Sequence, residues 1–314
     1  MEPLLRVRAL HRRFGAKPVL RGLEFRLEPG DVLGLLGPNG AGKTTCLRIL
    51  SGNLAPSSGQ VSIRGRDIAA AAARSQLGYL PERPPLYPEM RVDEYLHFCA
   101  RLHRVPPRAI GQAVDRIKRR CGLAQAGRRL LGKLSKGYQQ RAGLAQALIH
   151  EPELVILDEP TDGLDPLQIR EVRELIRDLA PSAGVIVSSH ALAEVQAVCN
   201  RVIILRDGEV LHQGALPDAD ADNRFCVRLR HPPATAELTA LSPIAVASPV
   251  FASGTSSETA SAPSRFRIEL ADGASPDQLA AALVGSGWGL LELVPERTDL
   301  ERVFFQSIDA EARP

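Results

Sequence analysis

The sequence lacks several features that would place it in a specialised class of proteins. None of its apolar runs is long enough to span a bilayer, so any role at a membrane requires a partner. The first residues, Met1-Glu2-Pro3-Leu4-Leu5-Arg6, lack the apolar core of a signal peptide. The net charge of +3 over 314 residues is too small to indicate binding to nucleic acid. We therefore expect a cytoplasmic protein that does not bind nucleic acid.

Paired cysteines and clustered histidines are also missing. The five cysteines are scattered and form no C-x-x-C pair, which favours free thiols in a reducing compartment. The seven histidines are equally dispersed, and only His190 lies where chemistry is expected. Hydrophobic residues make up 44% of the chain and charged residues 24%, values that are typical of a globular protein with a sizeable core.

One glycine-rich stretch matches a motif in full. Residues 37–45 read GPNGAGKTT and fit the phosphate-loop pattern G-x-x-x-x-G-K-[ST]. The glycines let successive N–H groups point at an anion, and the N-terminus of the helix predicted to follow adds partial positive charge. Lys43 is suited to neutralise β- and γ-phosphates, and the Thr44 hydroxyl to bind Mg²⁺. The predicted nucleotide-binding residues of this loop are Gly37, Pro38, Asn39, Gly40, Ala41, Gly42, Lys43, Thr44 and Thr45.

Strand and helix patterns alternate up to about residue 215, which predicts an α/β domain with a parallel sheet. The segments 153–157 and 184–189 are predicted to be buried strands, because residues 154–157 and 184–187 form continuous apolar runs. Helical periodicity dominates residues 83–150, which we interpret as an inserted helical subdomain. Its second half is basic, and we interpret those charges as a solvated helix face, with anionic lipid headgroups nearby as the alternative. An antiparallel β subdomain is predicted from the segments 4–10, 19–27 and 60–64.

Residues 216–314 are predicted to form a small accessory domain after a linker rich in Pro, Asp and Ala. Their order β-α-β-β-α-β-α suggests a ferredoxin-like α+β fold. Ser275 and Pro276 are the predicted N-cap and first residue of one helix, and 298–308 is predicted to be the last helix. Residues 252–263 are poor in hydrophobic residues and are predicted to form a loop. This domain is expected to regulate, to aid dimerisation or only to stabilise.

Two adjacent acids, Asp158 and Glu159, end the predicted strand at 153–157. Asp158 is suited to hold Mg²⁺ directly or through water, and Glu159 to position or polarise an attacking water. The alternative is that these two acids are ordinary surface charges. A phosphate loop in the same chain favours a catalytic site instead. Ser135 is the predicted N-cap of another helix, whose N-terminus offers a second anion site. His190 ends the strand at 184–189, where it is placed to contact a γ-phosphate.

In chain order, these motifs resemble the ATP-binding subunits of ABC transporters over residues 1 to about 215. The resemblance implies that residues 37–45 are the Walker A loop, that Asp158 is the Walker B acid and that Glu159 is the catalytic base. It further implies that Leu134–Tyr138 is the signature motif, in which Ser135 and Gly137 lie nearest to phosphate. Asp162–Asp165 is then the D-loop and His190 the switch histidine. Phe14 stands at the position of the aromatic ring that stacks on adenine.

Two positions depart from the usual motifs of this family. Lys136 and Tyr138 replace a Gly and the Gln of the signature Leu-Ser-Gly-Gly-Gln. Glu82 stands at the position of the Q-loop glutamine, where a carboxylate can ligate Mg²⁺ or orient water but cannot donate an amide hydrogen bond. The implied metal ligands are therefore Thr44, Glu82 and Asp158. Both departures are similar to the gliding-motility-type branch of ABC-2 exporters.

The resemblance implies an ATPase that uses ATP and Mg²⁺ and serves an ABC-2-type exporter. Two copies are expected to meet head to tail around two ATP molecules and to drive a separate integral membrane permease from the inner face of the cell membrane. One alternative is a soluble ABC ATPase that acts on nucleic acid or ribosomes, but no sustained heptads occur in 69–133, and only one cassette is present. The other is a scaffold with a decayed site, which is disfavoured by the presence of Lys43, Asp158, Glu159 and His190.

Overall fold

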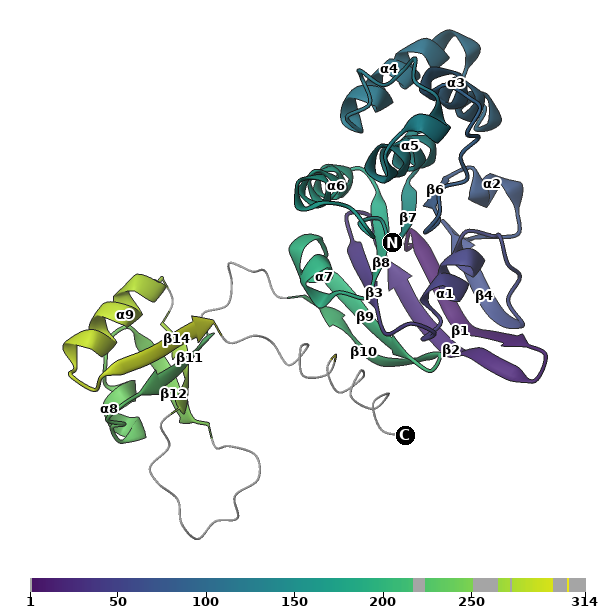
Figure 1. The fold of residues 1–314 in the computed structure, drawn as a ribbon. Coiled ribbons are helices and arrows are strands. Elements are labelled where there is room, and N and C mark those ends of the chain that lie inside the picture. The colour runs from purple at the N-terminus through teal and green to yellow at the C-terminus, as the bar shows by residue number, and fades with distance from the viewer. Residues whose placement is uncertain (1, 217–223, 251–264, 272, 296–303, 305–314) are drawn as a thin grey trace. The chain divides into compact units, whose positions relative to one another are not determined.

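A computed structural model describes residues 2–216, 224–250, 265–271, 273–295 and 304. The described residues divide into two compact units, one made of those up to Leu216 with Phe304 and the other of those from Arg224 to Pro295 (Figure 1). The loop predicted at 252–263 and, apart from Phe304, the helix predicted at 298–308 lie outside the described residues.

A six-stranded sheet lies at the centre of the first unit, in the order β10-β9-β3-β8-β7-β6. All neighbours in it pair in parallel except β10, which forms an antiparallel hairpin with β9. Every residue of β3, β7 and β8 is buried, which explains their continuous apolar runs and confirms the predicted parallel sheet. The strands are β3 (Val32–Leu36), β6 (Leu77–Leu80), β7 (Leu154–Asp158), β8 (Gly184–Ser189), β9 (Arg201–Arg206) and β10 (Glu209–Ala215).

A second, antiparallel sheet has the order β2-β1-β4-β5. Its apolar residues share one core cluster with β3 and with the helix that follows the glycine-rich loop, α1 (Lys43–Leu50). This shared core fixes the start of α1 at the end of β3, which is the strand–loop–helix arrangement that a phosphate loop requires. The strands are β1 (Leu5–Phe14), β2 (Lys17–Leu27), β4 (Ser58–Ile63) and β5 (Arg66–Asp67).

Three helices between β6 and β7 gather beside the sheet, as predicted for the inserted segment (Figure 1). They are α3 (Val92–Leu102), α4 (Ile110–Arg120) and α5 (Lys136–Leu148), and they share a second core cluster with β7, β8 and the helix α6 (Pro166–Leu179). The remaining helices of this unit are α7 (Leu192–Val198) and the short α2 (Ala71–Arg74). The alanine-rich α2 was not predicted, because four residues are too few to show helical periodicity.

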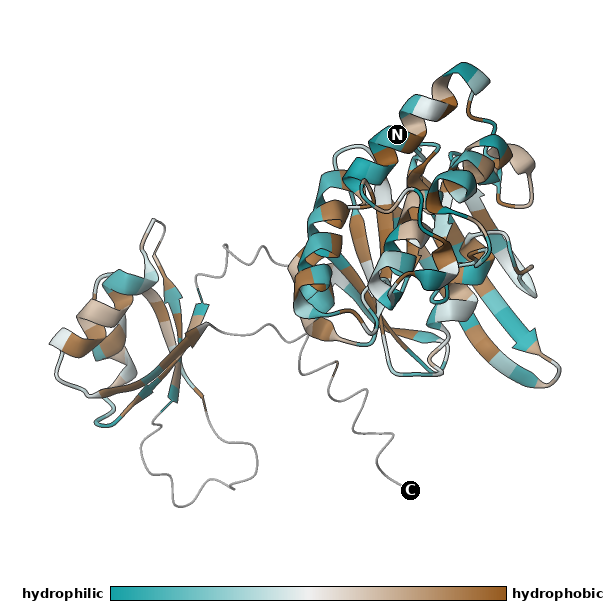
Figure 2. Ribbon diagram, turned by 45° about the horizontal axis from the view of Figure 1, so that its top comes forward, coloured by the Kyte–Doolittle hydropathy of each residue, from teal (hydrophilic) through white to brown (hydrophobic). Residues whose placement is uncertain are grey.

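Apolar residues follow the interior strands and the inward stripes of the helices, while the outward helix surfaces are largely hydrophilic (Figure 2). No helix in the described part of the chain is long and apolar enough to cross a membrane.

The second unit holds a four-stranded antiparallel sheet in the order β12-β13-β11-β14. With the helices α8 (Thr235–Thr239) and α9 (Pro276–Gly285), the chain order is β-α-β-β-α-β, as the ferredoxin-like prediction requires. Ser275 caps α9 by accepting from the backbone N–H of Gln278, and Pro276 is its first residue. The strands are β11 (Arg224–Leu229), β12 (Ile244–Pro249), β13 (Arg265–Leu270) and β14 (Leu290–Pro295).

Candidate active site

The glycine-rich loop joins β3 to α1, and two of its glycines are required by geometry. A Cβ atom on Gly37 would overlap the backbone carbonyl of Leu205. Gly42, the N-cap of α1, has a φ of +105°, a conformation that L side chains rarely adopt. No acidic residue occupies the first turn of α1. The loop therefore presents a helix N-terminus whose partial positive charge suits a phosphate group.

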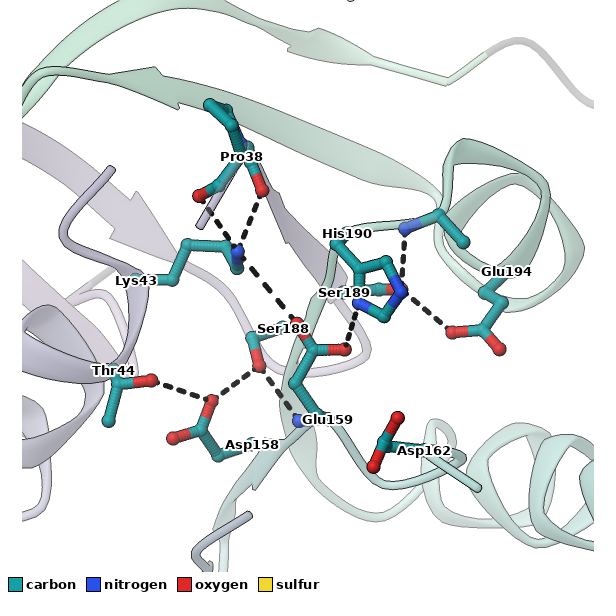
Figure 3. Close-up of polar contacts among 12 residues, drawn as sticks. Pro38, Lys43, Thr44, Asp158, Glu159, Asp162, Ser188, Ser189, His190 and Glu194 are labelled. Carbon is teal, nitrogen blue, oxygen red and sulfur yellow. Dashed lines mark hydrogen bonds and ion pairs between the residues drawn. The ribbon is translucent and has the colours of Figure 1, made fainter. Parts of the chain in front are cut away.

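Lys43 is the one cation of the loop, and its side chain is only 6% exposed. Its ammonium donates to the carbonyls of Gly37 at 2.7 Å and Pro38 at 3.2 Å. It also lies 3.8 Å from a carboxylate oxygen of Glu159 (Figure 3). Burial lowers the pKa of Lys43, while the acids Glu159, Asp158 and Glu82 oppose that shift. A nucleotide phosphate would supply the anionic partner that the two neutral carbonyls do not.

Asp158, at the end of β7, lies next to the loop and is fully buried. Its Oδ1 accepts from the hydroxyls of Ser188 at 2.6 Å and Thr44 at 3.4 Å (Figure 3). Its Oδ2 is buried without a hydrogen-bond partner among the described residues. Burial raises the pKa of Asp158, and the hydrogen bonds from Ser188 and Thr44 limit the rise.

The surroundings of Asp158 fit a Mg²⁺ ion. A buried carboxylate oxygen without a donor is costly unless a cation or proton satisfies it. Carboxylate and hydroxyl oxygens are the ligands that Mg²⁺ prefers, and Asp158 and Thr44 provide one of each within 3.4 Å of each other. These two residues would hold the ion, as the sequence predicts. Glu82, the third predicted metal ligand, follows β6 and lines the same cavity as Lys43 and Thr44.

Glu159 follows Asp158 directly and adopts a left-handed backbone conformation with φ of +46°. Its side chain is 12% exposed, and one oxygen lies 3.0 Å from Nδ1 of His190 (Figure 3). Burial raises the pKa of Glu159, while His190 and Lys43 oppose the rise. His190 is 56% exposed and comes just after β8, so the ends of two neighbouring strands bring a carboxylate and an imidazole together.

Lys43, Thr44, Glu82, Glu159 and His190 line a cavity of about 400 Å³, and Asp158 lines a second cavity that shares Thr44 and Glu82 with it. The walls of the first cavity come from the loop, from the end of β6 and from the ends of β7 and β8. Of the predicted site residues, those that line it are Asn39, Gly40, Gly42, Lys43, Thr44, Thr45, Glu82, Glu159 and His190; Asp162 and Val19 line it as well. A cavity lined by phosphate-loop donors, one lysine and three acids can bind a nucleoside triphosphate and place a water beside a base.

Seven predicted nucleotide-binding residues do not line this cavity, namely Gly37, Pro38 and Ala41 of the loop, the buried Asp158, and Phe14, Ser135 and Gly137. Phe14 ends β1 with an exposed ring, and the guanidinium of Arg12 lies 4.5 Å from the centre of that ring. Ser135 is the N-cap of α5 as predicted, but its side chain makes no capping hydrogen bond in the described structure. Gly137 is buried in the first turn of the same helix. The two signature residues thus lie together at the start of α5, and neither lines the Lys43 cavity of the same chain.

One contributor was not assigned a role from the sequence. The Ser188 hydroxyl donates to Asp158 and accepts from the backbone N–H of Glu159 at 2.9 Å, so it holds both acids. Its only signal in the sequence is its place at the end of a buried strand beside Ser189 and His190. The neighbouring Ser189 instead donates to Glu194 at 2.7 Å and accepts from the N–H of Ala191.

Comparisons with known proteins agree with this geometry. Residues 20–162 match the ABC transporter family. The chain is 38% identical to YdbJ, an ABC transporter ATP-binding protein of Bacillus subtilis, over 70% of this chain and 71% of the relative. It is 36% identical to the bacitracin transport ATP-binding protein BcrA of Bacillus licheniformis, over 68% and 70% of the two chains. A solved structure of an ATP-binding subunit of an ABC transporter superposes with a TM-score of 0.64 at 32% identity, covering 68% of this chain and 91% of that chain.

Proposed function

The chain belongs to the ATP-binding subunits of ABC transporters and is an ATPase, and from this premise we propose that it powers an ABC-2-type exporter as one half of an ATP-sandwiching pair. The single observation that carries the proposal is that Ser135 and Gly137 do not line the cavity that Lys43 and Glu159 of the same chain line. Each copy then carries two partial sites, and a second copy in a head-to-tail arrangement completes both.

Within each site, the residues of this chain divide the work. The loop N–H groups and Lys43 bind the phosphates and neutralise charge that develops on them. Mg²⁺, held by Thr44 and Asp158, would neutralise further charge on the β- and γ-phosphates. Glu159 accepts a proton from the water that attacks the γ-phosphorus, while the bond to the β-phosphate oxygen breaks and ADP leaves. His190 orients Glu159 through their 3.0 Å contact.

The signature residues of the second copy would close the site from the other side. The Ser135 hydroxyl is exposed, makes no capping bond in the described structure and stands at the N-terminus of the 13-residue α5. A helix N-terminus with a hydroxyl that is not used for capping suits a γ-phosphate. Closure of the pair on ATP and its reopening after hydrolysis would supply the movement that drives transport.

The partner in transport would be a separate integral membrane permease, and the chain would act at the inner face of the cell membrane. Its relative BcrA is named for bacitracin transport, which supports a role in transport. Glu82 stands between the catalytic cavity and a second cavity of about 640 Å³, which Arg83 and Pro85 also line. Glu82 would therefore couple the ATP site to the permease.

Co-expression with a membrane protein of about six spans encoded beside this gene tests the proposal. The two proteins should co-purify in detergent, and the membrane protein should stimulate ATP hydrolysis. Glu82→Ala should reduce that stimulation while ATP binding persists. Recovery of the chain without the permease, together with stimulation by DNA or ribosomes instead, would favour a soluble ABC ATPase and contradict the exporter proposal.

A further inference from the structure

The first turn of α5 is tied to the loop that follows the catalytic acids. The ammonium of Lys136 lies 3.1 Å from Oδ2 of Asp162, and both side chains are more than half exposed. Gly163 has a φ of +66°, and a Cβ atom there would overlap the Lys136 ammonium. The lysine side chain therefore lies across the loop of residues 160–165, directly over Gly163.

A second contact between α5 and this loop, a buried hydrogen bond, lies one turn further along the helix. Gln140 is 3% exposed, and its side-chain amide donates to the carbonyl of Pro160 at 3.1 Å. Pro160 follows Glu159 in the chain, so this bond ends one residue from the catalytic carboxylate. Gly137 packs closely against Gln168 in the first turn of α6, where a Cβ atom would overlap the Gln168 side chain. The start of α5 thus contacts the segment from Pro160 to Gln168 at three points.

We propose that Lys136 and Gln140 are positioning residues that link the two ATP sites of the pair. The inference rests on the proposed function, in which Ser135 and Gly137 touch the nucleotide held by the other copy. When that nucleotide draws the start of α5 into place, Lys136 and Gln140 carry the displacement to residues 160–162 of their own chain. Glu159 sits at the beginning of that loop, so ATP bound in one site sets the position of the base in the other.

Because the Lys136–Asp162 pair is exposed, its effect on catalysis can be measured without a large effect on folding stability. Exposed ion pairs contribute about 0–1 kcal/mol to folding, so removing this one should leave the chain folded. Charge exchange distinguishes this contact from a direct contact of Lys136 with the other copy's phosphates. A negative charge at position 136 would abolish a contact with phosphate. It would preserve an ion pair with position 162 if that residue became positive.

Steady-state ATP hydrolysis as a function of ATP concentration tests the inference. Lys136→Ala should lower kcat roughly three- to tenfold and bring the Hill coefficient toward 1, while the affinity of the monomer for a fluorescent ATP analogue stays unchanged. The double variant Lys136→Asp/Asp162→Lys should recover much of kcat and the cooperativity, and Lys136→Arg should resemble the wild type. Arg170→Ala is the matched control, since it removes another exposed ion pair, Arg170–Glu174 at 2.9 Å, from α6.

Three results would overturn the inference: a Lys136→Ala variant that behaves as the wild type, a charge-exchanged variant that recovers nothing, or a wild type without cooperativity. Gln140→Met should also lower kcat, but a loss of folding would explain that result, so the Lys136 series is decisive. A wild type that neither hydrolyses ATP nor pairs with a second copy would instead contradict the proposed function. The two failures are therefore distinguishable.

Discussion

The hydroxyl of Ser188 lies 2.6 Å from Oδ1 of Asp158 and donates a hydrogen bond to it inside the core. The Ser188 hydroxyl oxygen also accepts from the backbone N–H of Glu159. One side chain on β8 therefore holds both acids at the end of β7. Because Asp158 is buried, this bond also helps to keep the carboxylate charged. The geometry of the two catalytic acids thus depends on a neighbouring strand rather than on their own sequence.

Ser188→Ala should weaken the response to Mg²⁺. Loss of the hydrogen bond raises the pKa of Asp158 further and frees its side chain to turn, as when an outer partner of a metal ligand is removed. We expect the Mg²⁺ concentration for half-maximal ATP hydrolysis to rise about 10-fold or more. Ser189→Ala is the matched control, because Ser189 bonds to Glu194 and the Ala191 N–H instead. An equal shift in both variants would refute the role of Ser188.

Glu159→Gln should retain ATP binding and lose turnover. The amide keeps the size of the side chain but cannot accept a proton, so the closed pair should accumulate with ATP bound. We expect kcat to fall at least about 100-fold, as is usual when a general base is removed. Radiolabelled ATP hydrolysis and size-exclusion chromatography with ATP measure the two effects. Near-normal turnover in this variant would remove Glu159 from the role of base.

The pH dependence of kcat/KM should show the environment of Glu159. Burial raises its pKa, so the acid limb of the profile should lie above the ordinary value of 4.5. His190 opposes that rise, and His190→Ala should therefore move the limb of the remaining activity to higher pH. Glu194→Gln serves as the control, since Glu194 bonds to Ser189 and not to Glu159. A limb that moves to lower pH in His190→Ala would contradict this geometry.

Stability should fall on mild acidification because of His150. Its ring stacks on that of His103 at a centroid distance of 3.7 Å, and burial, with the charge of His103, lowers the pKa of His150 to about 4. The unfolded chain, with a value near 6.5, binds a proton that the folded chain does not, so stability is lost as the pH falls below 6.5 toward 4.

Urea unfolding at pH 7.5 and pH 5 measures this loss. The wild type should lose about 1–2 kcal/mol through His150, a discounted figure because the ring is only partly buried. In His150→Gln the loss should be smaller by that amount, whereas the exposed His231→Gln should not alter it. An unchanged pH response in His150→Gln would show that the ring is not kept neutral by its surroundings.

Much of the first unit was predictable because its signals are local. The continuous apolar runs at β7 and β8 and the glycine pattern at 37–45 each specify a strand or a loop without knowledge of distant residues. Ser275 as N-cap and Pro276 as first residue predicted the start of α9 in the same way. By contrast, the two-residue β5 and the four-residue α2 are too short to carry a periodic pattern.

The contacts inside the site were not predictable, because they join residues far apart in the sequence. The bond between Ser188 and Asp158 depends on the pairing of β7 with β8, and the Lys136–Asp162 pair depends on how α5 packs beside the loop. From the sequence, Lys136 was noted only as a departure from the signature motif. The structure adds its contact with Asp162 in the loop of residues 160–165.

The composite site is tested most directly by mixing two inactive variants. Lys43→Ala removes the phosphate lysine from both sites of a pair, and Ser135→Arg blocks the signature side of both. A mixed pair holds one site with an intact Lys43 from one copy and an intact Ser135 from the other. Co-purified mixtures should therefore regain ATP hydrolysis, up to about a quarter of the wild-type rate for independent sites. If Lys43 and Ser135 serve the same site within one chain, the mixture will be as inactive as either variant alone.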